Sequence, residues 1–363
     1  MMYTNDMFDD LLSQATIENV QRCHTNLLKS GKQIVLYGAG TIAVSTINSM
    51  RADGLDVSYV CDSDVNKVGK TLLGVEIISI ERLVEIKDSV NVIITTGAVN
   101  EVHKKLNHFA INHFAINHEI IDWREKLLNS VSEMRDGIKL IVPLLTDDES
   151  RGVFYNAMRH YMLLDYNYNW IEKHIRANQY FYQIALEKES FVDVGAFDGD
   201  TFRDFIDVCQ NNYANYYGIE MDIDNFNSLK DKTKGFHDVE LFNCAATSSD
   251  CMLSYKKTSD DKKSDFTLSQ LGDTAVNGRS VDNLLSDKRV TFLKADIEGA
   301  ELDMLKGAEK IISEQKPKCA ICVYHNPEHF WKVPLYLHNL NPNYKFSFRM
   351  HQPLLFEVVC YAL

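Results

Sequence analysis

The most informative run in the chain is Phe191-Val-Asp-Val-Gly-Ala-Phe-Asp-Gly-Asp-Thr201. An apolar strand end leads into Asp193, Gly195 and Gly199, and the residues that follow have a helical pattern. This D-x-G-x-x-x-G spacing differs from the G-x-G-x-x-G spacing of a dinucleotide site. Glycine is needed where the backbone passes close to a ligand, because a side chain would fill the ligand's space. The carboxylate suits a ligand with an ammonium and a sulfonium group, so we predict a methyl-donor site, with an ordinary strand–turn–helix as the alternative.

Length and composition limit the classes of protein. At 363 residues the chain is long enough for two domains, and its 45% hydrophobic and 25% charged content is ordinary for a soluble globular protein. A net charge of −13 argues against binding to nucleic acid, which depends on clustered lysine and arginine. The acidic N-terminus lacks the basic and apolar regions of a secretory signal, and no apolar run approaches the ~20 residues of a membrane span. Eight scattered cysteines fit a reducing compartment, so we expect a cytoplasmic protein.

The first part of the chain alternates strands with helices. We predict an N-terminal helix over 8–30 within a segment 1–30, followed by a Rossmann-like domain over 31–122. Its expected strands are 33–37, 57–61, 75–78, 92–95 and 120–121, and its expected helices are 41–51, 80–87 and 98–107. Alternation of this length implies a parallel sheet.

Two patterns in the sequence resemble metal sites, and we interpret both as structural. A tandem repeat, Asn107-His-Phe-Ala-Ile111 and then Asn112 to Ile116, places histidines five residues apart. That step fits neither helical nor strand periodicity, so a duplication at a surface connection is the better interpretation. Cys319 and Cys322 have C-x-x-C spacing, but strand residues three apart point to opposite faces, so they would not chelate one metal. We assign no residue to a metal site, and metal dependence stays open because Asp296, Glu298 and Asp222 could ligate Mg²⁺ through oxygen atoms.

The second part is a second doubly wound α/β domain. We predict a helical bridge over 123–188 and an α/β domain over 189–363. Its expected strands are 191–194, 216–220, 239–244, 290–295, 318–324, 344–349 and 355–361. The last two lack an intervening helix, so we expect an antiparallel hairpin at one end of the sheet. The polar stretch 250–275 is expected to be an exposed loop or a small hairpin.

Acidic residues and one histidine follow the expected strands of this domain. Glu220 ends a strand 25 positions beyond Gly195, where an acid accepts hydrogen bonds from ribose hydroxyls. Asp296 and Glu298 follow the fourth strand at the edge where ligands bind in open α/β sheets, whereas we interpret Glu301 as an acid in the first turn of a helix. His325 follows the fifth strand and is a candidate base for removing a hydroxyl proton, or a positioning group. A structural histidine is an equal alternative.

At this point the residues resemble one family, the FkbM-type methyltransferases that use S-adenosylmethionine (SAM). The matching runs are Phe191–Thr201, Tyr217–Glu220, Ser280–Leu284, Lys294–Glu301 with Leu305–Ala308, and Tyr324–His325 with Trp331–Pro334. The most distinctive is Lys294-Ala-Asp-Ile-Glu-Gly-Ala-Glu301. Ala295 and Asn243-Cys244 depart mildly from the family pattern. The resemblance implies a class I methyltransferase fold and methylation of hydroxyl oxygens, often on sugars or polyketides.

These motifs together give the predicted site. The residues expected to bind the donor are Asp193, Gly195, Ala196, Phe197, Gly199, Thr201, Glu220 and Asp296. The residues expected to take part in catalysis are His325, Glu298 and Asp296.

The first domain resembles a different unit, the small Rossmann-like domain in front of sugar acetyltransferases and some carbohydrate-modifying enzymes. The resemblance rests on Tyr37-Gly-Ala-Gly-Thr41, on Cys61-Asp62 and on Leu73-Gly-Val75. Gly38-x-Gly40-x-x-Ala43 fits a phosphate at a helix N-terminus, and Asp62 would then contact a ribose. A nucleotide or nucleotide-sugar fits this turn better than a redox cofactor, and a scaffold that binds nothing is the alternative.

We therefore predict a SAM-dependent O-methyltransferase acting on a sugar or glycan precursor. One alternative is an NAD(P)-dependent oxidoreductase that uses the Gly38 turn, although no Tyr-x-x-x-Lys pair stands near it. The other is a nucleotide-sugar-binding module without catalytic activity.

Overall fold

The computed structural model describes residues 2–28, 31–116, 120–121, 124–182, 184–257, 266–268 and 274–363. These residues form two compact units. Unit 1 comprises Met1–Val142, Asp147–Ile175 and Gln352–Phe356, and unit 2 comprises Pro143–Thr146, Arg176–His351 and Glu357–Leu363. Each unit contains a mostly parallel sheet, which confirms the predicted pair of doubly wound α/β folds.

Unit 1 is built on a sheet in the order β3-β4-β2-β1-β5-β6. Its strands are β1 (Gln33–Tyr37), β2 (Val57–Cys61), β3 (Thr71–Leu72), β4 (Val75–Ile78), β5 (Val90–Ile94) and β6 (His113–Phe114). All neighbouring pairs are parallel except β3 with β4. The strand β5 is buried along its whole length, as expected for a parallel strand covered on both faces.

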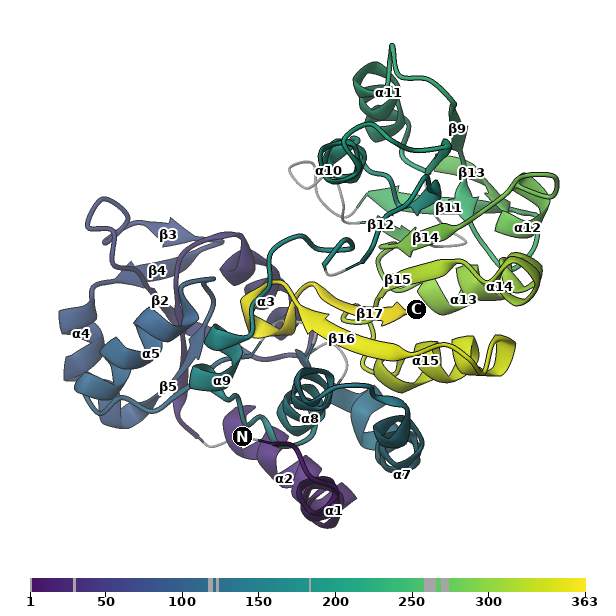
Figure 1. The fold of residues 1–363 in the computed structure, drawn as a ribbon. Coiled ribbons are helices and arrows are strands. Elements are labelled where there is room, and N and C mark those ends of the chain that lie inside the picture. The colour runs from purple at the N-terminus through teal and green to yellow at the C-terminus, as the bar shows by residue number, and fades with distance from the viewer. Residues whose placement is uncertain are drawn as a thin grey trace. The chain divides into compact units, whose positions relative to one another are not determined.

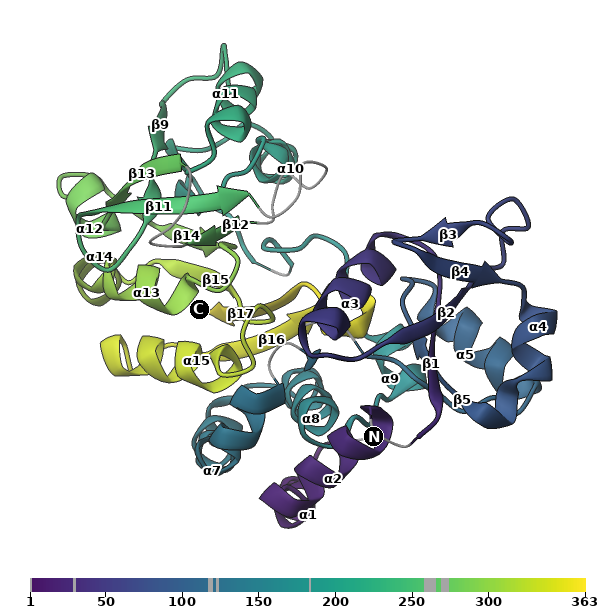
Figure 2. The same cartoon turned by 180° about the vertical axis from the view of Figure 1, so that it is seen from behind.

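The direction of the crossovers decides which face of the unit 1 sheet each connecting helix covers. Besides two N-terminal helices, unit 1 contains α3 (Thr41–Ala52), α4 (Ile80–Glu85), α5 (Val99–His108), α7 (Arg124–Ile141), α8 (Asp148–Leu163) and α9 (Tyr168–Lys173). The connection through α3 runs from β1 to β2, whereas the one through α4 runs from β4 back to β5. Right-handed crossovers therefore place α3 on one face and α4 with α5 on the other, as Figures 1 and 2 show.

Three predictions for this part were wrong. The helix expected over 8–30 is two helices, α1 (Asn5–Gln14) and α2 (Ile17–Leu28). The break occurs because Ala15 leaves helical geometry and the Thr16 hydroxyl accepts a hydrogen bond from Asn19 N–H, which begins a new helix. Ile120 and Ile121 are helical, not a strand. The tandem repeat is more than a surface connection, because its second copy supplies β6 and buries Ile116.

Unit 2 contains a seven-stranded sheet in the order β16-β17-β15-β14-β7-β8-β9. Its strands are β7 (Ser190–Val194), β8 (Asn215–Glu220), β9 (Val239–Asn243), β14 (Phe292–Ala295), β15 (Lys318–Cys322), β16 (Phe346–Met350) and β17 (Val358–Ala362). The strand β17 lies between β15 and β16 and runs antiparallel to both. The predicted terminal hairpin is therefore confirmed.

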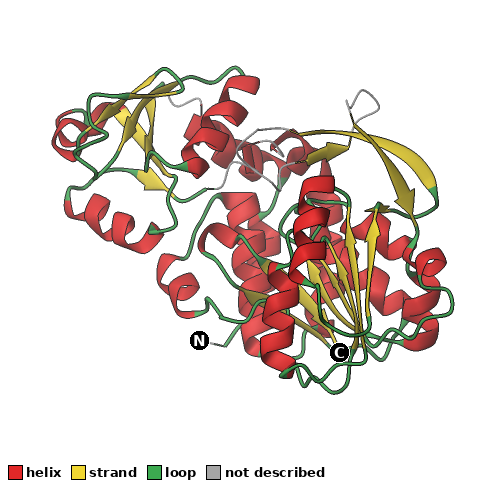
Figure 3. Ribbon diagram, turned by 90° about the horizontal axis from the view of Figure 1, so that it is seen from above, coloured by secondary structure: helices red, strands yellow, loops and turns green. Residues whose placement is uncertain are grey.

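The sheet of unit 2 is covered by helices on both faces (Figure 3). The helices are α10 (Asp200–Cys209), α11 (Ile223–Lys232), α12 (Val281–Leu284), α13 (Glu301–Lys306), α14 (Glu309–Gln315) and α15 (His329–Leu340). The chain moves outward from β7 through β8 to β9 and then returns to β14. The direction of the crossovers reverses between β7 and β14, so the place where ligands bind in such sheets lies at their carboxyl ends.

A small second sheet follows β9 in unit 2. It consists of β10 (Ala245–Ala246), β11 (Cys251–Lys257), β12 (Phe266–Leu268) and β13 (Thr274–Arg279), and Figure 2 shows β11 to β13 together. The predicted loop or hairpin over 250–275 is thus part of a four-stranded sheet, with 258–265 and 269–273 outside the described residues. Three short 3-10 turns complete the described structure, at Lys87–Ser89, Val142–Leu144 and Pro353–Leu355.

Among the described residues, the helices are all too short or too polar to cross a membrane.

Candidate active site

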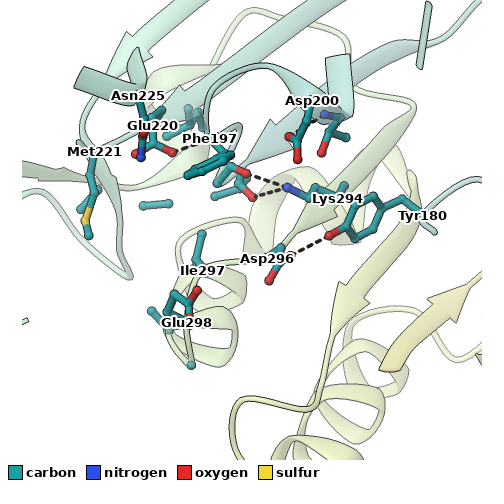
Figure 4. Close-up of a pocket in the computed structure, with 18 of the residues that line it drawn as sticks. Tyr180, Phe197, Asp200, Glu220, Met221, Asn225, Lys294, Asp296, Ile297 and Glu298 are labelled. Carbon is teal, nitrogen blue, oxygen red and sulfur yellow. Dashed lines mark hydrogen bonds between the residues drawn. The ribbon is translucent and has the colours of Figure 1, made fainter. Parts of the chain in front are cut away.

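A cavity of about 560 Å³ lies along the carboxyl edge of the unit 2 sheet (Figure 4). Residues that follow successive strands line it in the order of the sheet. The segment Cys244–Ala246 follows β9, Glu220 ends β8, Gly195 follows β7 and Asp296 follows β14. Tyr324 follows β15 and Glu357 precedes the antiparallel β17, which completes the row. Drug-sized ligands occupy cavities of roughly 300–1,000 Å³, so this one is large enough for a nucleoside with a side chain.

The conformation of the turn after β7 is fixed by the close approach of the backbone after β14. Gly195 has φ +75°, and a Cβ atom there would lie 1.9 Å from the carbonyl oxygen of Asp296. Gly199 has φ +89° and is the N-cap residue of α10. Glycine at 195 is therefore required by the crossing of two backbone segments as well as by its left-handed conformation. The result is a tight turn whose backbone lines the cavity.

A buried ion pair holds this turn. The Nζ atom of Lys294 lies 2.9 Å from Oδ1 of Asp193 and donates to the carbonyl oxygens of Gly195 at 2.7 Å and Val194 at 3.3 Å. Tyr216 donates its hydroxyl proton to Oδ2 of Asp193 at 2.8 Å. Burial alone would lower the pKa of Lys294, but the charges of Asp193 and Asp296 outweigh it and raise that pKa. Asp193 therefore acts on the cavity through Lys294, which lines it, and is itself fully buried.

Glu220 joins the ends of two neighbouring strands. Its Oε2 accepts a hydrogen bond from Phe197 N–H at 3.0 Å, and its Oε1 accepts one from Asp222 N–H at 2.8 Å. Burial raises the pKa of Glu220 to about 7, although these two backbone donors oppose the shift. The carboxylate lines the cavity at the position where an acid binds ribose hydroxyls in doubly wound sheets.

The loop after β14 carries two of the predicted acids. Oδ2 of Asp296 accepts a hydrogen bond of 2.6 Å from the hydroxyl of Tyr180, and Figure 4 shows the two side chains directed at each other. Glu298 and Gly299 have φ values of +54° and +98°, so the loop makes a left-handed bend. This bend places Asp296 and Glu298 together on the cavity wall.

His325 lies behind these acids. Its Nε2 is 3.4 Å from Oδ1 of Asp296 and 3.5 Å from Oε2 of Glu298, and its Nδ1 is 2.9 Å from Oε1 of Glu301. Burial would lower the pKa of His325, but the charge of Glu301, followed by those of Asp296 and Glu298, raises it well above its ordinary value. The carboxylates around the ring therefore favour its imidazolium form, which has no lone pair to accept a further proton.

Glu357 adds an acid at the far end of the row. Burial, followed by the charge of Asp296, raises the pKa of Glu357 to about 7. Gln179 donates a hydrogen bond to its Oε2. Five carboxylates line the cavity, those of Asp200, Glu220, Asp296, Glu298 and Glu357, whereas the ammonium of Lys294 is already paired with Asp193. The cavity therefore favours a positively charged ligand.

The structure places the predicted residues at different distances from the cavity. Six of them line it, namely Gly195, Phe197, Thr201, Glu220, Asp296 and Glu298. Four stand outside its lining, namely Asp193, Ala196, Gly199 and His325. Their predicted roles in binding and catalysis stay predictions.

Among the lining residues that sequence reasoning missed are Tyr180, Lys294 and Glu357. A signal existed for one of them. Lys294 interrupts an apolar strand, and a buried lysine requires a carboxylate partner. Tyr180 and Glu357 carry no comparable pattern.

Among the described residues, two groups of side chains have the spacing of metal ligands. Asp296, Glu301 and His325 bring three ligand atoms within 4.8 Å of one another, as do Asp296, Cys322 and Glu357. In the first group Glu301 is already engaged by two imidazoles. In the second, burial raises the pKa of the Cys322 thiol well above its ordinary value, whereas a metal needs the thiolate. We assign neither group to a metal.

The predicted nucleotide turn of unit 1 is also bonded internally. Oδ2 of Asp62 accepts a hydrogen bond from Ala39 N–H at 2.7 Å and lies 3.0 Å from Nζ of Lys67. Oδ1 accepts one from Asp64 N–H at 2.8 Å. The Gly38 turn repeats the geometry of the Gly195 turn, with a backbone N–H held by the acid after the next strand. Unlike the acid of the Gly195 turn, Asp62 forms an ion pair with a lysine, Lys67. A ribose would have to share the Asp62 carboxylate with Lys67.

Comparison with known families assigns the part of the chain that contains the cavity to a protein family. Residues 193–349 match the family described as the methyltransferase FkbM domain. This part of the chain is an FkbM methyltransferase domain. The match confirms the predicted family and, with it, SAM as the cofactor. The chain is therefore a methyltransferase.

Residues 6–141 match a second family, described as the C-methyltransferase C-terminal domain. The predicted resemblance of the first domain to a unit of sugar-modifying enzymes is not confirmed by this match. No curated protein sequence matches the chain.

Solved structures extend the comparison of the fold. The methyltransferase FkbM from Methylobacillus flagellatus KT is 21% identical, and the similarity covers 99% of both chains with a TM-score of 0.76. The FkbM fold is therefore shared over the whole length. UDP-D-quinovosamine 4-dehydrogenase from Vibrio fischeri is 20% identical over 23% of this chain and 77% of its own, with a TM-score of 0.21. Perosamine N-acetyltransferase from Caulobacter crescentus is 25% identical over 22% of this chain and 37% of its own, with a TM-score of 0.19.

Proposed function

We propose that the protein is a SAM-dependent O-methyltransferase that methylates a hydroxyl group of a sugar or glycan precursor. The observation that carries the proposal is the row of residues along the sheet edge. It combines a small-residue segment, an acid in the ribose position, a glycine turn and a group of acids within one cavity. When bound, SAM supplies a methyl group on a positively charged sulfur, and its transfer leaves the neutral thioether S-adenosylhomocysteine (SAH).

The donor would be held by residues at successive strand ends. Cys244, Ala245 and Ala246 offer a flat surface for an adenine ring, and Glu220 offers a carboxylate for ribose hydroxyls. The Gly195 turn leaves room for the remaining chain, and Asp296 offers a charge for its ammonium group. The excess of carboxylates in the cavity favours a cationic donor over its neutral product.

Transfer to a hydroxyl requires removal of its proton as the oxygen attacks the methyl carbon. Bound SAM would supply the methyl group, and a carboxylate of Asp296 or Glu298 would accept the hydroxyl proton and pass it to water. His325 is poorly suited to take this proton, because the three carboxylates around it favour its protonated form. Of the two predicted roles of His325, positioning is therefore the one that we propose.

The proposal also specifies which atom of the acceptor receives the methyl group, here an oxygen. The match of residues 6–141 to a C-methyltransferase domain favours a second candidate, transfer to carbon. The acid pair at Asp296 and Glu298 serves either reaction, because an acidic C–H must also lose a proton. The two are separated by carbon-13 NMR of the product after transfer of a labelled methyl group, since O-methyl and C-methyl carbons have well-separated chemical shifts.

Isothermal titration with SAM tests donor binding. We expect binding by the full chain, and a loss of about 10- to 100-fold in Glu220→Ala, because a hydrogen bond to a charged group contributes roughly 1.5–3 kcal/mol. Glu314→Ala is the control, since Glu314 is an exposed acid on α14 of the same unit. Absence of SAM binding by the wild-type chain, or equal affinity of wild type and Glu220→Ala, would contradict the proposal. Detection of SAH after incubation with a glycan pool tests the turnover.

A further inference from the structure

Glu301 is a buried acid whose carboxylate lies under the active-site loop. It is the first residue of α13, and its side chain is 0% exposed. Oε1 accepts hydrogen bonds from Ile297 N–H at 3.0 Å and Gly299 N–H at 3.3 Å. These two donors flank Glu298, which has φ +54°. The carboxylate thus stabilises a left-handed bend that costs roughly 1–2 kcal/mol for a residue with a side chain.

The same carboxylate binds two imidazoles. Oε1 is 2.9 Å from Nδ1 of His325, and Oε2 is 3.1 Å from Nδ1 of His329 at the start of α15. Burial would raise the pKa of Glu301, but His325 and then His329 outweigh it and keep that pKa well below its ordinary value. The group therefore stays charged.

Contact with Glu301 also fixes the orientation of the His325 ring. Because Nδ1 of His325 is held at Glu301, the opposite nitrogen, Nε2, faces Asp296 at 3.4 Å and Glu298 at 3.5 Å. Turning the ring by 180° would put Cδ2 in the place of Nδ1 and Cε1 in the place of Nε2, so a carbon atom would face Glu301 and another would face the two acids. The buried carboxylate of Glu301 thus stabilises the conformation of the loop that carries Asp296 and Glu298, and it also fixes the orientation of the His325 ring.

We propose that Glu301 is a positioning residue for methyl transfer, which orients His325 and the Asp296–Gly299 loop although it does not line the cavity. The inference rests on the proposed function of that cavity. It goes beyond the sequence-based interpretation of Glu301 as an acid in a helical first turn. The α13 helix has only six residues, and the carboxylate contacts backbone N–H groups before the helix and histidines outside it.

Histidine NMR tests the proposal without an acceptor. In the wild-type chain labelled with nitrogen-15 histidine, we expect both ring nitrogens of His325 to carry protons at neutral pH, with His325→Gln used to assign its signals. In Glu301→Gln we expect this doubly protonated signature to be lost from His325, because the charge at Nδ1 is gone. Glu314→Gln, which removes an exposed acid, should leave the signals unchanged.

Turnover gives the second readout. Glu301→Gln and His325→Gln should each lower the rate of SAH formation by about 100-fold, at the low end of the contribution of a proton-transfer group, with the affinity for SAM within about threefold of wild type. Glu301→Asp keeps the charge and should restore part of the rate.

Several results would overturn the positioning role. One is an unprotonated Nδ1 of His325 in the wild-type chain, which is decisive even if Glu301→Gln does not fold. Others are unchanged His325 signals in a folded Glu301→Gln, a wild-type rate in His325→Gln, or an equal loss of SAM affinity and turnover in Glu301→Gln. Failure of the wild-type chain to bind SAM would instead overturn the proposed function, while the NMR comparison would still decide the contact between Glu301 and His325.

Discussion

At the scale of single residues, substitution of Gly195 allows the cost of a left-handed backbone to be compared with the cost of a steric clash. Gly195→Ala adds left-handed strain and also places Cβ 1.9 Å from the Asp296 carbonyl oxygen. Gly235→Ala is the matched control, because Gly235 has φ +92° with no neighbouring atom within 4 Å. We expect about 1–2 kcal/mol of destabilisation for Gly235→Ala and at least about 2 kcal/mol more for Gly195→Ala, together with loss of SAM binding. Urea unfolding and titration measure both, and equal losses of stability would refute the steric argument.

The acid Glu220 makes stability depend on pH in an unusual direction. Its folded-state pKa of about 7 lies above the ordinary 4.5, so between these values the folded protein binds more protons than the unfolded chain. The contribution of Glu220 to stability is therefore largest at low pH and falls as pH rises through this window, by about 3 kcal/mol at most. We therefore expect the unfolding free energy of wild type to fall relative to that of Glu220→Gln as pH rises through this window. Glu314→Gln should show no such shift, and a flat difference for Glu220→Gln would contradict the argument.

Residues that act through a local pattern could be predicted from the sequence, and those that act through distant contacts could not. Gly195, Glu220, Asp296 and Glu298 follow strand ends, and a parallel sheet brings such ends to one edge. Tyr180 meets Asp296 across 116 positions of sequence, so only the folded chain reveals the pair. The surroundings of His325 were likewise hidden, because the fold brings its three neighbouring carboxylates together from other parts of the chain.

At the scale of elements, short strands between turn signals were the most predictable. The strands β1, β2 and β4 have the expected bounds, because each is a short, mostly apolar run of four or five residues. Short edge elements were not predictable, since β6 has two residues and depends on β5 for its pairing. The break between α1 and α2 was missed because apolar spacing continues across it, while the signal was a capping threonine.

That cap gives a prediction for the N-terminal helices. Thr16→Ala removes the hydroxyl that accepts the hydrogen bond from Asn19 N–H, and should cost about 1 kcal/mol of unfolding free energy. Thr16→Ser keeps an oxygen at the cap and should stay within a few tenths of wild type. Urea unfolding compares the three proteins. Equal stability of Thr16→Ala and Thr16→Ser would show that the cap does not stabilise α2.

At the scale of the whole molecule, the chain repeats one design twice with different outcomes. In each unit a glycine turn follows the first strand, and the acid after the next strand accepts a backbone N–H from that turn. In unit 2 the acid lines a cavity with several other carboxylates, whereas in unit 1 Lys67 pairs with it. The sequence distinguished the two turns by their glycine spacing and predicted a methyl donor at one and a nucleotide at the other. It did not reveal that Lys67 pairs with Asp62, since Lys67 lies outside either motif.

Hydrogen exchange with two ligands distinguishes the turns. Saturating SAH should slow amide exchange at Gly195, Glu220 and Asp296, and at 100 times its dissociation constant it should stabilise the folded state that binds it by about 2.7 kcal/mol. UDP-glucose, the probe for the predicted nucleotide site, should leave exchange around Gly38 unchanged in the wild-type chain, because Asp62 is bonded to Ala39 and Lys67. Lys67→Met is the informative variant, since it frees one side of the Asp62 carboxylate while leaving its two backbone donors in place. Protection of the Gly38 turn by UDP-glucose in wild type would show that Lys67 belongs to a binding site, and protection that appears only in Lys67→Met would show that the lysine closes one.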